Sequence, residues 1–379
     1  MARPALPDFP WDSLAPAKAR AAAHPGGIVD LSVGTPVDPT PDVVTEALRS
    51  AADAPGYPQT YGTPGLREAV AGWFARRRGV PGLDPDGVLP TIGSKELVAW
   101  LPLLLGLGAG DVVAHPHVAY PTYDVGARLA GARPVKAGTV EELETAAAQA
   151  ARDGGRLGLL WLNSPGNPTG AVLGVDALRE LVDWARAHDV VVASDECYAE
   201  LGWTPELDTT RGGLVPSVLD PRVSGGAVDG LLAVYSTSKQ SNLAGYRAAF
   251  VAGDPALVRA LLDLRKHAGM IVPWPVQVAL RAAVSDDEHV AVQRERYRAR
   301  REVLLTALTG AGFRVDESVA GLYLWSTRDE PGRETVADLA ARGILVAPGD
   351  FYGPGAAQHV RVALTATDER IAQVAGRLA

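Results

Sequence analysis

The chain of 379 residues is predicted to adopt an α/β fold, with a layered central sheet and a smaller α+β unit towards its C-terminal end. The main observation is that short apolar runs alternate with helical stretches between residues 111 and 235, which indicates strands separated by helices. The runs at 190–194 and 231–235 are apolar throughout, as is typical of strands buried on both faces. Helices dominate after residue 255, and short strands return only near the C-terminal end.

The first part of the chain is predicted to be an arm followed by helices. Residues 1–40 carry several prolines and little periodicity, so we expect an arm that lies on other parts of the protein. In the next segments apolar residues recur at spacings of three and four, as at Leu66, Val70 and Trp73, which indicates helices. We expect Thr40 to cap the first helix, because a threonine hydroxyl accepts hydrogen bonds from free backbone N–H groups. Helices are expected at residues 41–52, 65–78 and 94–107.

Functional positions are expected where the strands of the middle part end. In layered α/β sheets ligands bind beyond the carboxyl ends of the strands. Asn163, Asp195 and Ser236 each follow directly on an apolar run, so we expect them to line a ligand site. Strands are expected at residues 111–115, 133–136, 157–162, 190–194 and 231–235, and helices at 121–130 and 175–187.

The C-terminal part is predicted to be a separate, smaller α+β domain. A long helical region at 276–308 is expected to bend near residues 285–286. We therefore expect an N-terminal arm at 1–40 that joins the small domain, a large domain at 41–275 and a small domain at 276–379. The remaining strands are expected at 313–315, 321–325, 344–346 and 359–363, with helices at 335–342 and 368–378.

Composition narrows the classes of function. The net charge of −8 leaves no basic surplus to neutralise phosphates, so a nucleic-acid binder is not expected. A single cysteine excludes an internal disulfide and a cysteine-based metal cluster. No apolar run approaches the roughly 20 residues that span a bilayer. Residues 1–12 lack the basic head and apolar run of a signal peptide, and we expect a cytoplasmic protein.

Three other features have plain structural interpretations. His115 and His117 lack a companion carboxylate or cysteine at ligand spacing, so no metal site is expected there. Cys197 is expected to be a packed thiol rather than a nucleophile. The arginine-rich run at 294–301 alternates with Glu and Tyr and is expected to be a solvated helix face.

The segment Ser236-Thr-Ser-Lys239 carries the strongest chemical signal. Lys239 comes just after a buried apolar strand, where a lysine is costly unless it is paired or chemically used. The hydroxyls before it and Arg247 after it suit a phosphate, because arginine offers a fork of donors. An amine beside a phosphate site indicates a Schiff base with pyridoxal phosphate. A solvated lysine in a polar loop is the alternative interpretation of this segment alone.

Three more segments fit the same site, although each has a plainer interpretation. The turn-rich run 163–170 would place the Asn167 side chain in the site as a donor, or it is an ordinary loop. Asp195 would pair with a protonated pyridine nitrogen, or it is a salt-bridged aspartate. Ser94 and Lys95 open a helix whose free N–H groups can hold phosphate, or Ser94 is only a cap.

Taken together in this order, the motifs resemble those of fold type I, pyridoxal-phosphate-dependent aminotransferases of class I/II. The resemblance runs from about residue 31 to the C-terminal end. It implies a mostly parallel central sheet in a large α/β/α domain, a small α+β domain and a homodimer. The matching segments are Tyr61-Gly-Thr-Pro-Gly-Leu-Arg67, Gly93-Ser-Lys95, Tyr120-Pro-Thr-Tyr123, Asn163-Ser-Pro-Gly-Asn-Pro-Thr-Gly170, Ser194-Asp-Glu-Cys-Tyr198, Ser236-Thr-Ser-Lys239 and His359-Val-Arg361.

The resemblance also implies a role for each site residue. Lys239 would bind the cofactor covalently and carry the proton, and Arg361 would grip the substrate α-carboxylate with the Gly34 backbone beside it. Asp195 would pair with the ring nitrogen, Asn167 and Tyr198 with the ring hydroxyl, and Tyr120 would stack on the ring. The phosphate would be lined by Ser94, Lys95, Ser236, Ser238 and Arg247, and by Tyr61 from the neighbouring subunit.

Within this family the chain resembles the N-succinyldiaminopimelate aminotransferases of high-GC Gram-positive bacteria over its full length. The segments that carry this resemblance are 6–12, 31–41 and 238–247. The resemblance implies transfer of an amino group from glutamate to a succinylated oxopimelate in lysine biosynthesis. Such a substrate needs a second cationic contact in addition to Arg361, and Lys95 is a candidate to bind the distal carboxylate. Another class I/II aminotransferase, of aspartate, aromatic or LL-diaminopimelate type, and a carbon–sulfur β-lyase remain open. A cofactor-binding regulator is disfavoured, because residues 1–40 leave no room for a DNA-binding domain.

Overall fold

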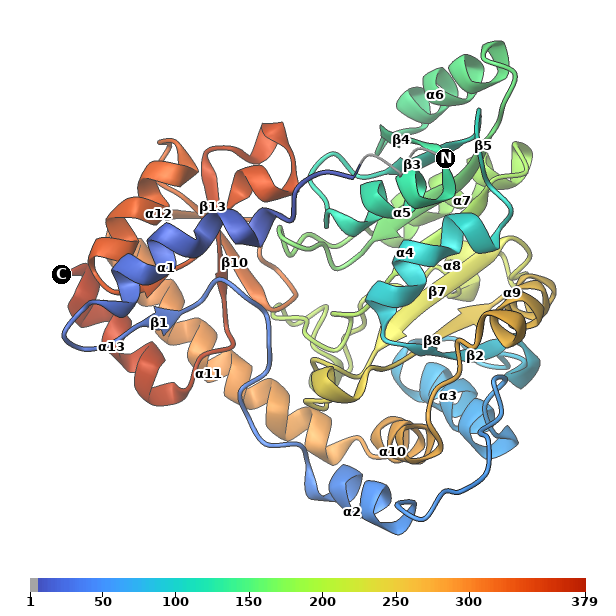
Figure 1. Ribbon diagram of the computed structural model, residues 1–379, viewed down its shortest axis with the longest axis horizontal. Helices are drawn as coiled ribbons and strands as arrows, with labels where there is room; N and C mark the ends of the chain where they lie inside the picture. The colour runs from blue at the N-terminus through green and yellow to red at the C-terminus, as the bar shows by residue number, and fades with distance from the viewer. Residues whose placement is uncertain (1–5) are drawn as a thin grey trace.

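The larger of the sheets in the computed structural model, which describes residues 6–379, has seven strands (Figure 1). Their order is β2-β8-β7-β6-β5-β3-β4. Neighbours from β7 to β4 are parallel, whereas β8 is antiparallel to both β7 and β2. The predicted α/β class with a mostly parallel sheet is confirmed. The strands are β2 (Val88–Ile92), β3 (Val112–His115), β4 (Arg133–Lys136), β5 (Leu157–Asn163), β6 (Val191–Asp195), β7 (Leu231–Ser236) and β8 (Ala248–Gly253).

Helices cover both faces of this sheet. One face packs against α2, α3, α6, α7 and α10, and the other against α4, α5 and α9. The short helix α8 (Pro221–Ser224) adds Val223 to the first of these cores. The helices are α2 (Asp42–Ser50), α3 (Pro64–Arg77), α4 (Ser94–Leu104), α5 (Thr122–Ala130), α6 (Val140–Arg152), α7 (Val175–Ala187), α9 (Pro255–Ala268) and α10 (Trp274–Ser285).

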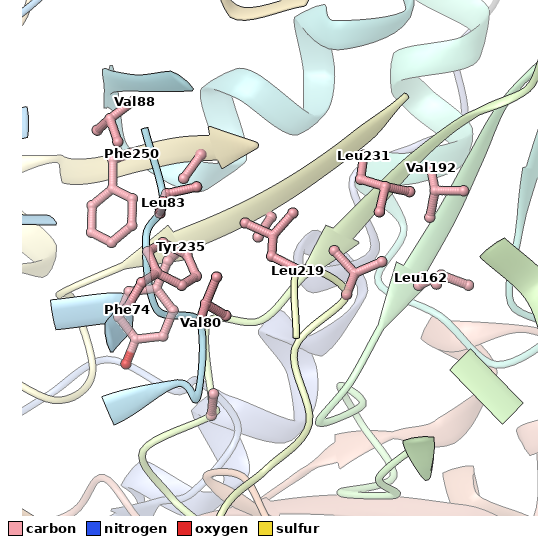
Figure 2. Packing of buried hydrophobic residues seen from close by; sticks show 14 of the residues in the cluster. Phe74, Val80, Leu83, Val88, Leu162, Val192, Leu219, Leu231, Tyr235 and Phe250 are labelled. Carbon is pink, nitrogen blue, oxygen red and sulfur yellow. The ribbon is translucent and has the colours of Figure 1, made fainter. Parts of the chain in front are cut away.

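Strand β5 shows why the central strands are apolar throughout. Successive side chains of a strand point to opposite faces. Leu160 and Leu162 accordingly join one core, and Leu159 and Trp161 join the other. Figure 2 shows the first of these cores, where aromatic side chains of α3, β7 and β8 meet. The rings of Tyr235 and Phe250 lie 5.6 Å apart there.

The C-terminal part has its own antiparallel sheet and its own core. The strand order is β12-β13-β10-β9, and α11, α12 and α13 contribute to the same core. The N-terminal arm joins this part, because β1 pairs with β11 and α1 packs beside α12 (Figure 1). The elements are α1 (Ala15–Ala22), β1 (Val29–Asp30), α11 (Glu288–Gly310), β9 (Arg314–Asp316), β10 (Tyr323–Thr327), α12 (Gly332–Ala341), β11 (Ile344–Leu345), β12 (Ala347–Pro348), β13 (His359–Ala363) and α13 (Asp368–Leu378).

Helix α10 lies at the predicted boundary between the large domain, 41–275, and the small domain, 276–379. The long helical region breaks between Ser285 and Glu288, close to the expected bend. Helix α10 packs against α2 and α3, and its Val276 and Leu280 lie in the core of the large sheet. The packing therefore changes at the α10–α11 junction rather than at residue 276. The division into an arm, a large and a small domain stays a prediction, and residues 1–5 of that arm lie outside the described residues.

Two local predictions were wrong. Thr40 does not cap α2: the N-cap is Pro41, and the Thr40 hydroxyl instead donates to the Asn242 carbonyl at 3.4 Å. The arginine-rich run on α11 is not a solvated face. Arg294 and Tyr297 are completely buried, and Arg300 pairs with Asp38 of the arm at 2.6 Å. Buried carboxylates, which the local sequence does not reveal, draw these arginines inward.

Among residues 6–379, no helix combines the length and the apolar character needed to cross a membrane.

Candidate active site

A cavity of about 480 Å³ lies beyond the carboxyl ends of β5, β6 and β7. It is lined by side chains from the arm, from the large sheet with its helices and from the C-terminal sheet. Every residue predicted for the site lines it except Tyr61. The strand-end residue Asn163 lines it as expected. The walls also contain residues that the sequence did not assign to the site: Phe9, Trp11, Val33, Thr35, Tyr123, Cys197, Ala244 and Tyr323.

Lys239 follows the end of β7 and extends towards the arm. Its Nζ donates a hydrogen bond to the backbone carbonyl of Gly34. Burial lowers the pKa of Lys239, and the positive charges of Arg361 and Arg247 act in the same direction. A lowered pKa increases the fraction of neutral amine, which is the nucleophilic form.

Asp195 ends β6 as a buried carboxylate without a cation. One oxygen accepts a hydrogen bond from the Tyr123 hydroxyl at 3.0 Å, and the other accepts from the Cys197 backbone N–H at 3.2 Å. Burial raises the pKa of Asp195, and these hydrogen bonds offset only part of the effect. Among the described residues no Lys, Arg or His forms an ion pair with it. A carboxylate in this state suits a cationic ring nitrogen, which would restore its ordinary ionisation.

Asn163 holds the loop after β5 against Asp195. Its side-chain amide donates to the Asp195 carbonyl at 3.0 Å, and its side-chain oxygen accepts from the Asn167 N–H at 2.8 Å. These bonds present the Asn167 side chain to the cavity. The position of Asn163 at a strand end marked it as a site residue, but no sequence pattern gave its partners.

Hydroxyl groups and Arg247 gather where a phosphate is expected. Ser236 and Ser238 lie with their hydroxyl oxygens 2.7 Å apart, and Ser94 opens α4 with its free N–H groups. The Arg247 guanidinium lies against Gly93. A Cβ on Gly93 would come 2.3 Å from the Arg247 Nη2, and the glycine has φ of 80°. Only glycine therefore leaves room for the guanidinium at this point.

Arg361 of β13 is a buried cation whose three nitrogens are used unequally. Its Nη1 donates to the Asn167 side-chain oxygen at 3.0 Å and its Nη2 to the Ser32 carbonyl at 2.7 Å. Its Nε is buried and has no hydrogen-bond partner in the described part of the chain. A buried guanidinium with neutral partners suits a substrate carboxylate, which arginine binds through a fork of donors.

Tyr198 and Tyr323 form one wall of the cavity. Their hydroxyl oxygens are 3.1 Å apart, and burial raises the pKa of Tyr198, which keeps it a neutral donor. The Arg361 guanidinium lies 4.0 Å from the Tyr323 ring centroid. Tyr323 needs a glycine at position 34, because a Cβ on Gly34 would lie 2.2 Å from the Tyr323 hydroxyl oxygen. Tyr323 was missed because an aromatic residue inside a strand is more often read as core.

Lys95 lies at the exposed side of the cavity between two aromatic rings. Its Nζ is 5.4 Å from the Phe9 ring centroid and 5.9 Å from that of Tyr120. Phe9 and Trp11 come from the arm, where proline-rich sequence gave no signal of a site.

Tyr61 lies outside the cavity of its own chain. Its hydroxyl donates to the Asp86 carbonyl at 2.9 Å, and the Arg67 guanidinium lies 3.9 Å from its ring centroid. The expectation that Tyr61 serves a neighbouring subunit stays a prediction.

Comparison with known families decides what kind of site this is. Residues 27–378 match the model of the aminotransferase class I and II family. The chain belongs to this family. It is 60% identical over 373 residues to a probable aminotransferase of Mycobacterium tuberculosis, covering 98% of this chain and 85% of that protein. It is 57% identical to the 4-dedimethylamino-4-oxo-anhydrotetracycline transaminase OxyQ of Streptomyces rimosus, over 98% and 99% of the two chains.

More distant relatives agree with the fold. An LL-diaminopimelate aminotransferase of Gloeobacter violaceus is 33% identical over 98% of this chain and 95% of its own length. A crystal structure of an aminotransferase from Neisseria meningitidis superposes with a TM-score of 0.85 at 29% identity, covering 98% and 97% of the two chains. A Thermus thermophilus aspartate aminotransferase variant gives 0.85 at 26% identity, covering 100% and 98%. The predicted family, fold and enzyme class are thereby confirmed.

Aminotransferases of this family depend on pyridoxal phosphate, and the cavity fits it. The uncompensated Asp195 carboxylate and the Gly93 recess that admits Arg247 are the two features that show this fit. When bound, the cofactor supplies an electrophilic carbonyl carbon and an electron-withdrawing ring. Lys239 offers an amine to bind it and to hold a proton, while Arg361 offers donors to orient a carboxylate.

Proposed function

We propose that this aminotransferase transfers the amino group of N-succinyl-LL-2,6-diaminopimelate to 2-oxoglutarate, or the reverse, in lysine and diaminopimelate synthesis. The observation that carries the proposal is that, besides Lys239 and Arg247 at the cofactor end, two further cations line the cavity without a carboxylate partner among the described residues. These are Arg361, which is buried, and Lys95, at the exposed side. Both substrates carry an α-carboxylate and a distant second carboxylate.

The site roles are proposed on the same geometry. Lys239 binds the cofactor and moves the proton, Asp195 pairs with its ring nitrogen, and Tyr120 lies against the ring. Asn167 and Tyr198 approach the ring hydroxyl, and Ser94, Lys95, Ser236, Ser238 and Arg247 surround the phosphate. Arg361, with Gly34 and Asn167 beside it, binds the substrate α-carboxylate, and Lys95 is placed to serve the distal carboxylate as well.

The proposed enzyme is a homodimer in which Tyr61 reaches the phosphate of the partner's site. Tyr61 does not line the cavity of its own chain, which supports this arrangement. A solution mass of one chain by light scattering would contradict it. The cytoplasmic location expected from the sequence stays a prediction.

A panel of amino acceptors tests the substrate. Four acceptors are compared with the holoenzyme and glutamate as donor: the succinylated oxopimelate, its unsuccinylated form, an aromatic oxo acid and oxaloacetate. We expect the succinylated oxopimelate to give the highest kcat/KM. Lys95→Met should raise KM for the succinylated acceptor about fivefold, as an ion pair near the surface contributes modestly. Lys266→Met, on an exposed part of α9, is the matched control.

Other outcomes of the panel would replace the proposal. A higher kcat/KM with a polycyclic ketone would favour the chemistry named for the relative from Streptomyces rimosus. Pyruvate released from cystathionine, without amino transfer, would identify a β-lyase.

A further inference from the structure

The N-terminal arm places two aromatic residues, Phe9 and Trp11, at the cavity, and they pack against different parts of the protein. Trp11 packs on the C-terminal part, with its ring 5.2 Å from that of Phe351 and 6.4 Å from that of Tyr352. Phe9 lies beside Trp11, with ring centroids 5.6 Å apart, and extends to Lys95 of α4. The arm therefore bridges the C-terminal part and the large-sheet part at the cavity.

Phe9 gains little from packing in a core. Its side chain is 54% exposed, whereas the rings that anchor Trp11 are buried. Prolines on both sides, Pro7 and Pro10, restrict the backbone that carries it. The Phe9 ring lines the cavity and more than half of the residue is exposed, so the ring is available to contact a ligand there.

The contact of Phe9 with Lys95 gives this ring a chemical role. The ammonium group lies near the rings of both Phe9 and Tyr120, and it forms no ion pair with a carboxylate of the described residues. Aromatic faces attract a cation, so these two rings favour the position of the ammonium group at the cavity. An anion that enters the cavity to bind this ammonium would therefore lie beside the Phe9 ring as well.

We propose that Phe9 is a specificity-determining residue, which together with Lys95 and Tyr120 selects substrates that end in a carboxylate. The inference rests on the proposed use of Lys95 as the contact for the distal carboxylate. It adds that the N-terminal arm takes part in choosing the substrate. Phe9 contacts the non-reacting end, so it should affect binding and leave the chemical step unchanged.

A pair of oxo acids of equal length tests this in single turnovers. The amino form of the holoenzyme is mixed with 2-oxoglutarate or with 2-oxopentanoate, which has a methyl group in place of the distal carboxylate. Phe9→Ala should weaken apparent binding of 2-oxoglutarate about five- to tenfold and of 2-oxopentanoate by less than about twofold, with similar limiting rates. Phe9→Tyr, which keeps the ring, should behave as the wild type.

Two controls separate this role from general effects. Leu6→Ala changes another exposed side chain of the same arm that does not line the cavity, and it should change neither constant. Equal losses for the two oxo acids in Phe9→Ala, or the same selectivity change in Leu6→Ala, would overturn the inference. If Lys95→Met abolishes the preference for 2-oxoglutarate and Phe9→Ala does not, the Lys95 proposal stands and the Phe9 inference fails.

The succinylated acceptor is not used in this test. Failure of the proposed function in the acceptor panel and failure of the Phe9 inference therefore have different signatures.

Discussion

Two residues of this site, Lys239 and Asp195, have side chains whose charged forms are unfavourable in the buried positions that they occupy. Burial lowers the pKa of Lys239 and raises that of Asp195, so each is pushed towards its neutral form. Neither is neutralised by the other through an ion pair in the described structure. In the proposed roles, pyridoxal phosphate would take the Lys239 amine at one end of its ring and offer a nitrogen cation to Asp195 at the other. Cofactor binding would then offset the free-energy cost of burying these two groups.

Lys239→Ala should abolish the covalent link to the cofactor. Borohydride reduction of the wild-type holoenzyme should add the cofactor mass to the peptide that contains Lys239, and the variant should show no such peptide. Its turnover should fall by about 10²–10⁴-fold, the usual contribution of a positioned acid–base group. Lys266→Ala is the control. A labelled peptide elsewhere in the Lys239→Ala protein would refute the assignment.

At the scale of elements, the site depends on how strands pass into the segments that follow them. The turn between β2 and α4 is an example, because Gly93 adopts φ of 80° and ψ of 149° and leaves its face open to Arg247. Arg247 itself has φ of 56° and donates to the Ala244 carbonyl at 2.9 Å. Positive φ favours glycine, so the end of the cavity where we propose that the phosphate binds is built from two unusual turns.

Gly93→Ala should weaken cofactor binding far more than a comparable substitution elsewhere. The new methyl group would displace the Arg247 guanidinium, and we expect the Kd of pyridoxal phosphate to rise at least about tenfold. Gly106→Ala is the control, because Gly106 also has positive φ, 74°, but a Cβ there meets nothing within 4 Å. Fluorescence titration of the two apoproteins measures the difference. Equal Kd values for both variants would show that the recess is unimportant.

The sequence predicted the elements whose signal is local. Central strands such as β6 and β7 are apolar along their length, and the residues that end them, Asp195 and Ser236, line the cavity as expected. It missed β2, which contains Pro90, and β8, which is rich in alanine, because neither resembles a typical strand. Both are strands through pairing with each other, a long-range effect that overrides local propensity.

For the site, the same limit applies. Lys239, Arg247 and Arg361 could be predicted because a charged residue beside a buried apolar strand costs free energy unless it has a partner or a chemical use. Phe9 and Tyr323 could not, because an aromatic side chain is equally suited to a core and to a cavity wall, and only the tertiary arrangement distinguishes the two.

For the whole molecule, helix α11 ties several parts together through buried ions. Arg294 and Arg298 pair with Asp208 at 2.9 and 2.7 Å, and Arg300 pairs with Asp38 of the arm. Burial alone would raise the pKa of Asp208, but hydrogen bonds from Thr210 and from Arg294 outweigh it and lower the pKa to about 2. These carboxylates hold the loop 204–213 and the arm against one helix.

Asp208→Asn should destabilise the protein near neutral pH and flatten the acid dependence of stability. Because the pKa of Asp208 is lower in the folded than in the unfolded chain, its contribution is complete above about pH 4 and is lost as the pH falls towards 2. Removing one partner of a buried pair costs about 3 kcal/mol. Urea unfolding at pH 6 and pH 3.5 measures both effects. Asp176→Asn, at a 97% exposed position, is the control and should change neither.

The arm has a consequence for the order in which the protein is made. Arg361 is hydrogen bonded to Ser32, which precedes it by 329 residues, and β1 completes its pairing only with β11. Residues 29–32 are synthesised before these partners and therefore remain unpaired until residues 344–361 have been synthesised. Loop closure over such a separation is slow. The end of the cavity that contains Arg361 can thus form only after all seven strands of the large sheet have been synthesised.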